Sequence, residues 1–101
     1  MARPFYLEAV AKNDPDFLAV LESERELVMQ DGAIPARYKM LMTMVCDALL
    51  GHDKGCETIA NRARDAGATE AEIREAVRIA QHFGGVPALV SALGAYPKEQ
   101  G

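Results

Sequence analysis

The sequence predicts an all-α fold, a compact bundle of about five to six helices. Half of the 101 residues are hydrophobic, only 6% are aromatic, and tryptophan is absent. A core built from aliphatic and methionine side chains suits packed helices better than a β-sandwich. Apolar residues also recur at helical spacing between glycines and prolines, and no segment reads as a strand. We expect one domain over residues 1–101, because this length has room for a single core.

The first 30 residues predict two helices. Residues 1–13 read as a short segment that docks on the rest of the chain. Asp14 then offers a capping side chain, and Pro15 suits the first position of a helix that reaches Gln30. Asp31-Gly32 is expected to end this helix, with Gly32 able to adopt the left-handed conformation of a C-cap. The apolar side of the helix consists of Phe17, Leu18, Leu21 and Val28.

The next helix is predicted from Pro35 to about Leu50 and is almost wholly apolar. Such a helix is usually central in a bundle or shared with a neighbouring subunit. Its polar exceptions, Lys39, Thr43 and Asp47, recur every four residues and therefore form one stripe. We expect that stripe to face either water or a functional site.

Gly51 closes the apolar helix, and another helix is predicted from Asp53 to Ala66. Small residues on its inward side allow close contact with a neighbouring helix. Gly67 ends it. The residues expected on the inward side are Cys56, Ile59, Ala60 and Ala63.

The last helical region begins with a predicted capping box between Thr69 and Glu72. Gly84-Gly85 is expected to break the helix, Pro87 to restart it, and residues 98–101 to form a flexible tail. The expected buried stripe before the break is Ile73, Ala76, Val77, Ala80 and Phe83, and the apolar residues after it are Val86, Leu89, Val90 and Leu93.

Charge and composition exclude several classes of protein. The net charge is -4, and the arginines stand among acidic residues, so a nucleic-acid binder is not expected. No apolar run is long enough to span a membrane. The two cysteines form no disulfide framework, which favours a reducing compartment and hence the cytoplasm. Ligand motifs at close spacing are lacking, so we expect no metal and no cofactor.

Three short stretches together resemble the carboxymuconolactone decarboxylase and alkylhydroperoxidase D-like superfamily. They are Gly51-His52-Asp53-Lys54-Gly55-Cys56, Gly67-Ala68-Thr69 and Gly84-Gly85-Val86-Pro87. The resemblance covers about two thirds of the chain and implies an all-α fold that assembles through shared helical interfaces. It therefore implies a homo-oligomer such as a trimer or hexamer.

The same register shows where this chain departs from the family pattern. His52 stands where the family has its first cysteine, and Gly55 stands at the second. Ile59 replaces the histidine that follows, and Met40 replaces a glutamate that assists proton transfer in the peroxidase members. The chain is thus similar to a divergent member without the paired cysteines and without the following histidine.

The leading hypothesis from the residues is thiol chemistry at Cys56. A cysteine near a helix start can have a lowered pKa, and His52, four residues earlier, would share its face if the helix already includes position 52. Such a thiolate would attack a peroxide, with Cys46 or an external thiol reductant as the resolving partner. The chain would then be a thiol-dependent, peroxiredoxin-type oxidoreductase. The alternative is that both cysteines only pack, Cys46 as a small hydrophobic residue of the core and Cys56 beside Ile59 and Ala60.

Two other functions stay open. Asp47 is a carboxylate that can orient the His52 imidazole or act as a base, with His82 and Phe83 as further residues of a pocket. This set would serve a decarboxylase or lactone-processing enzyme that needs no cofactor and acts on a small organic acid. The third possibility is a helical oligomer without catalysis, in which the site has decayed.

Overall fold

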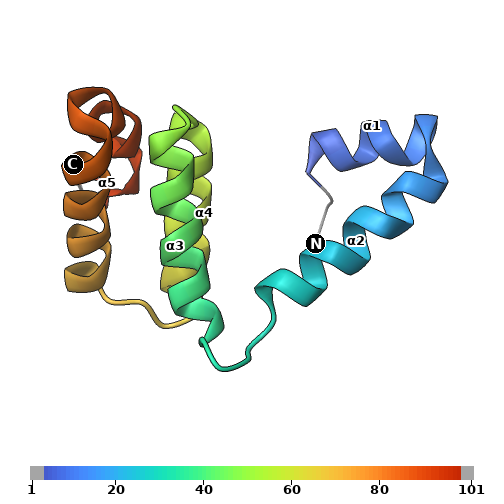
Figure 1. Ribbon diagram of the computed structural model, residues 1–101, viewed down its shortest axis with the longest axis horizontal. Coiled ribbons are helices and arrows are strands. Elements are labelled where there is room, and N and C mark those ends of the chain that lie inside the picture. The colour runs from blue at the N-terminus through green and yellow to red at the C-terminus, as the bar shows by residue number, and fades with distance from the viewer. Residues whose placement is uncertain (1–3, 99–101) are drawn as a thin grey trace. The chain divides into compact units, whose positions relative to one another are not determined.

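The computed structural model describes residues 4–98, so the parts of the docking segment and of the tail predicted at residues 1–3 and 99–101 lie outside the described residues. The described chain forms five α-helices and one short 3-10 helix, and it contains no strand (Figure 1). The prediction of an all-α fold with five to six helices is therefore confirmed.

The chain divides into two compact units, residues 1–30 and 31–101. The first unit holds α1, Phe5–Asn13, and α2, Pro15–Met29. The carboxylate of Asp14 accepts a hydrogen bond from the backbone N–H of Phe17 at 3.2 Å, which caps α2 as the sequence predicts. Only Leu7 and Leu18 are buried in these two helices.

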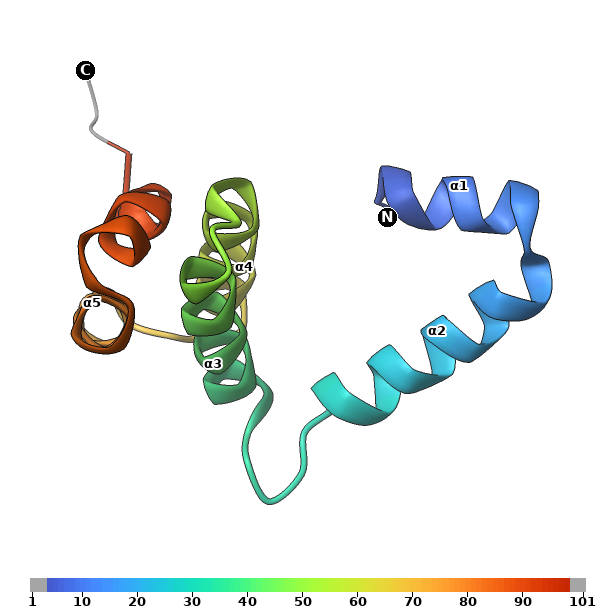
Figure 2. The same cartoon turned by 45° about the horizontal axis from the view of Figure 1, so that its top comes forward.

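The second unit holds α3, Ala36–Leu49, α4, Asp53–Asp65, α5, Glu70–Ala92, and the 3-10 helix η1, Leu93–Ala95. Figures 1 and 2 both show α3 and α4 side by side, and α3 also packs against α5. The largest fully buried side chains are Met44, Ile73, Val77 and Cys56. Alanines fill the space between them, so the helices approach closely; among these are Ala48, Ala60, Ala80 and Ala92.

The start of α5 and the break inside it follow the sequence prediction. The Thr69 hydroxyl accepts from the Glu72 N–H at 3.1 Å, and the Glu72 carboxylate accepts from the Thr69 N–H at 2.9 Å. Gly85 has φ 72° and ψ -165°, which interrupts the helical backbone. A Cβ at Gly84 would lie 2.5 Å from the Ala88 Cβ and 2.6 Å from a Leu49 methyl carbon. Position 84 must therefore lack a side chain for α3 and α5 to meet here.

Two local predictions are wrong. Phe83 is 76% exposed rather than buried, because the core line of α5 continues from Ile73 through Val77 and Ala80 to Gly84, and Phe83 is rotated about 100° from that line. Gly32 does not end α2 in the left-handed conformation. Among the described residues, the glycines with positive φ are Gly51, Gly67 and Gly85. Helix α2 ends at Met29, and its C-cap residue, Gln30, is extended.

Candidate functional site

The turn between α3 and α4 places His52 over the last turn of α3. Gly51 has φ 80°, the left-handed conformation that a glycine adopts without strain. The N–H of His52 donates to the carbonyl of Asp47 at 2.8 Å, and the N–H of Gly51 donates to the carbonyl of Ala48 at 3.2 Å. This pair of bonds is a Schellman motif, which satisfies the last carbonyls of α3. The backbone of position 52 is thereby held next to that of position 47.

The side chains of these two residues also meet. Asp47 Oδ1 lies 3.1 Å from His52 Nδ1, with 20% of the aspartate side chain and 58% of the histidine side chain exposed. A deprotonated carboxylate can only accept a hydrogen bond, so Nδ1 is the donor and carries the ring proton. In the neutral ring this tautomer leaves the lone pair on Nε2.

Cys56 occupies a different environment. Its side chain is fully buried, and its Sγ donates to the carbonyl of Met44 at 3.5 Å. Desolvation by burial, together with smaller contributions from the nearby charges of Asp47 and Asp53, raises the pKa of this thiol to about 11. At neutral pH the thiol is therefore protonated and enclosed, which is unfavourable for attack on a peroxide.

His52 and Cys56 are joined through the backbone, where the Cys56 N–H donates to the His52 carbonyl at 3.0 Å, but their side chains have different partners, Asp47 and the Met44 carbonyl. His52 is the N-cap of α4, with φ -90° and ψ 76°, so its backbone is not helical. The rule that residues i and i+4 share a helix face therefore does not apply to this pair. Cys46 is exposed on α3, and both cysteines are free thiols.

His82 and Phe83 lie together near the break in α5. Their rings make an edge-to-face contact with centroids 4.8 Å apart, and both side chains are exposed. They pack against each other, and no described contact joins either ring to His52. Their role as pocket residues stays a prediction.

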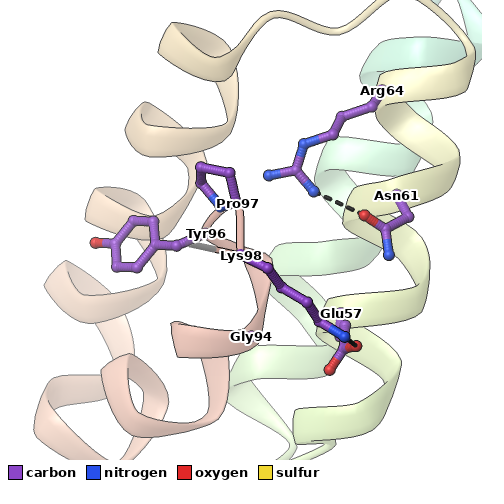
Figure 3. Close-up of a pocket in the computed structure, with 7 residues that line it drawn as sticks. All are labelled: Glu57, Asn61, Arg64, Gly94, Tyr96, Pro97 and Lys98. Atoms are coloured by element: carbon purple, nitrogen blue, oxygen red, sulfur yellow. Dashed lines mark hydrogen bonds and ion pairs between the residues drawn. The ribbon is translucent and has the colours of Figure 1, made fainter. Parts of the chain in front are cut away.

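A pocket of about 330 Å³ lies between α4 and the segment after α5 (Figure 3). The predicted site residues do not line it. Its charged groups are already paired: Lys98 Nζ lies 3.3 Å from a Glu57 carboxylate oxygen, and the Arg64 guanidinium donates to Glu70 at 2.6 and 2.8 Å. The lining residues are Glu57, Asn61, Arg64, Gly94, Tyr96, Pro97 and Lys98.

Arg64 connects the elements around that pocket by hydrogen bonds, a role that the sequence analysis did not predict. Besides Glu70, it donates to Asn61 Oδ1 at 2.8 Å and to the carbonyl of Ala95 at 2.6 Å. Hydrogen bonding to Glu70 raises the pKa of Arg64, and the same contact lowers the pKa of Glu70. With every side of the guanidinium engaged, this pocket is better explained as a connection between helices than as a binding site.

Neither a metal centre nor a membrane segment is evident in the part of the chain that the structure describes. Within residues 4–98, no three His, Cys, Asp or Glu side chains gather in a way that could hold a metal ion. The described helices are all too short or too polar to cross a bilayer.

Comparison with known proteins gave a match to a family model and similarity to solved structures. The model of the carboxymuconolactone decarboxylase family matches residues 15–96. A crystal structure of a candidate carboxymuconolactone decarboxylase from Burkholderia xenovorans is similar, with a TM-score of 0.87 and 22% identity, over 93% of this chain and 74% of the other. A carboxymuconolactone decarboxylase family protein from Legionella pneumophila gives a TM-score of 0.82 and 23% identity, over 90% of this chain and 81% of the other. A comparison with curated proteins gave no match.

Proposed function

This chain belongs to the carboxymuconolactone decarboxylase family, and we propose that it is an enzyme that processes a small organic acid by proton transfer at His52, without a cofactor. The observation that carries the proposal is the 3.1 Å contact between Asp47 Oδ1 and His52 Nδ1, with the imidazole open to solvent. A carboxylate that holds an imidazole in one tautomer and stabilises its charged form is an established arrangement for acid-base catalysis. The substrate class follows from the family name, a lactone that bears a carboxylate.

The chemical step needs only these two side chains. In a decarboxylation, the bond between the carboxylate carbon and the neighbouring carbon breaks, CO₂ leaves, and the electron pair stays on the organic fragment, conjugated with the lactone carbonyl. His52, protonated by solvent on Nε2 to give the imidazolium, then transfers that proton to the fragment. Asp47 stabilises the imidazolium before the transfer, and a proton from water restores it afterwards.

The first test separates this proposal from thiol chemistry. The variant with both Cys46→Ser and Cys56→Ser, incubated with carboxymuconolactone, is expected to release CO₂ at a rate within about threefold of the unmodified protein, because neither sulfur takes part in the step. The measurement is CO₂ release under substrate saturation. Cys46→Ser alone is the matched control for any effect of Cys56→Ser on folding, since Cys46 is exposed and Cys56 is buried. A loss of turnover in a folded Cys56→Ser variant would sink the proposal.

The competing hypothesis is a thiol-dependent peroxidase in which Cys56 attacks the peroxide, His52 assists, and Cys46 or an external thiol resolves the sulfenic acid. It requires a reachable thiolate. The burial of Cys56 and the rise of its pKa to about 11 weigh against it. A third hypothesis, a helical oligomer with a decayed site, predicts that no substrate is turned over and that His52→Ala alters no ligand binding.

We further propose that the protein works as a homo-oligomer, such as a trimer or hexamer, in the cytoplasm, where its two thiols would stay reduced. Residues 79–96 contain no Asp, Glu, Lys or Arg. Large apolar side chains in this segment are nevertheless half or more exposed, as is usual for the centre of a protein interface. These are Ile79, Phe83, Val86, Val90 and Leu93.

Sedimentation velocity tests the assembly. At micromolar concentration we expect a mass of several chains, and Phe83→Glu with Val90→Glu is expected to shift the distribution towards the monomer, because two buried charges would oppose the interface. The control is Gln81→Glu with Ser91→Glu, which adds the same charge to the same helix outside the apolar set. A monomer for the unmodified protein would contradict the proposal.

A further inference from the structure

We propose that Gly55 is a positioning residue for the Asp47–His52 pair: the missing side chain at position 55 is the space in which the Asp47 carboxylate lies. The inference deepens the proposed function, and its catalytic part rests on that function. Its structural part stands independently, because it concerns three residues whose contacts are defined without a substrate.

The space beside the backbone of Gly55 is too small for a side chain. A Cβ placed on Gly55 would lie 2.8 Å from Asp47 Oδ2, 2.9 Å from Asp47 Cγ and 3.2 Å from Asp47 Oδ1. Two of these distances are shorter than real Cβ contacts, so something would have to move. All three atoms belong to one carboxylate, which therefore lies close to the backbone of α4 at position 55.

The carboxylate cannot move away without leaving His52. Asp47 is a short side chain, and rotation about its Cα–Cβ bond carries Oδ1 and Oδ2 together. Oδ1 is the atom that lies 3.1 Å from His52 Nδ1. We therefore expect a rotation that relieves the contact at position 55 to weaken or break the contact with the imidazole. On this inference, a side chain at position 55 disrupts the Asp47–His52 hydrogen bond.

Backbone conformation does not explain the glycine. Gly55 lies in the first turn of α4 and is not among the glycines with positive φ. Inside a helix, glycine is about 1 kcal/mol less favourable than alanine. On backbone grounds alone, alanine would be the better residue. The requirement at position 55 is therefore steric, and Asp47 is what imposes it.

The tautomer of His52 reports the geometry directly. We expect the neutral ring to carry its proton on Nδ1 in the unmodified protein, because Asp47 accepts from that atom. In Gly55→Ala the displaced carboxylate no longer does so, and the Nε2–H form that predominates in free histidine should take over. The measurement is the ¹⁵N chemical shifts of the ring nitrogens, taken at a pH high enough that they no longer change with pH, where the ring is neutral. The chain has two histidines, so His82→Gln assigns the signals.

Controls separate the contact from a general disturbance. Gly32→Ala should leave the tautomer unchanged, because the nearest atom to its new Cβ is 3.9 Å away. Asp47→Ala should change the tautomer as Gly55→Ala does, and the double variant should be no different from Asp47→Ala alone, since the carboxylate that clashes is gone. If Gly55→Ala fails to fold, Asp47→Ala in the same chain should restore the fold.

The outcomes are distinct. An unchanged tautomer in folded Gly55→Ala, or a Gly55→Ala defect that persists in full without Asp47, would overturn the inference. With carboxymuconolactone as the probe, kcat/KM of Gly55→Ala should fall by the same factor as that of Asp47→Ala, to within about threefold, and the two losses should not multiply. If no variant or parent turns over this probe, the proposed function fails while the tautomer measurement still decides the role of Gly55.

Discussion

Replacing His52 with alanine is expected to lower kcat for carboxymuconolactone by about 10²–10⁴-fold, the usual contribution of a general acid or base. The imidazole is the group that would carry the transferred proton, and no second histidine contacts Asp47 in the described residues. Stability should change little, because 58% of the His52 side chain is exposed. The measurement is steady-state CO₂ release with the fold checked by circular dichroism.

Two controls make this result specific. His82→Ala removes the other histidine of the chain, which lies against Phe83, and should keep turnover within about threefold. Added imidazole should partly restore His52→Ala, because the open position allows a small base to enter. Full activity of His52→Ala would rule out proton transfer at this residue.

Met44→Ala is expected to cost about 2–5 kcal/mol of the free energy of unfolding, the range for truncation of a large buried aliphatic or methionine side chain. Met44 is fully buried at the centre of the cluster formed by α3, α4 and α5, and its removal leaves a cavity among small alanines that cannot collapse to fill it. Urea unfolding followed by circular dichroism measures the change.

Met42→Ala is the matched control from the same helix. Its side chain is 53% exposed, so the expected change is within about 0.5 kcal/mol for the isolated chain. An effect of Met42→Ala that grows with protein concentration would place Met42 in an interface between copies. Equal costs for the two substitutions at low concentration would contradict the described core.

The helices were predictable because the chain marks their ends with strong local signals. Asp14 and Thr69 cap helix starts, and Gly51 and Gly67 end helices in the left-handed conformation. These are interactions between residues a few positions apart, which a sequence displays directly. The small inward residues of α4 were predictable for the same reason, since their spacing fixes their face.

The two wrong predictions depended on the rotation of a helix about its axis or on backbone dihedral angles. Phe83 fits an apolar pattern for α5, yet the smaller Gly84 takes the core position because Leu49 approaches it from α3. The end of α2 lacks the left-handed glycine because Gln30 already turns the backbone into an extended conformation. Neither the approach of Leu49 nor the dihedral angles of Gln30 can be read from local periodicity.

The candidate site was partly visible in the sequence. Asp47 was predicted to orient the imidazole of His52, and their hydrogen bond fits that role. The pairing of His52 with Cys56 assumed a helical backbone at position 52, whereas His52 is a non-helical N-cap. The volume at Gly55 that receives the carboxylate is a property of two packed helices. It could not be found from either helix alone.

The guanidinium of Arg64 joins parts of the chain that lie 31 residues apart, through its bond to the Ala95 carbonyl, and it also grips the first residue of α5. The first residue of α5 and the 3-10 helix η1 that follows α5 thus share a single anchor on α4. Local unfolding at Glu70 or at Ala95 frees the Arg64 side chain and so weakens its hydrogen bond to the other residue. We therefore expect amide hydrogens near residues 70 and 95 to exchange with solvent in concert rather than independently.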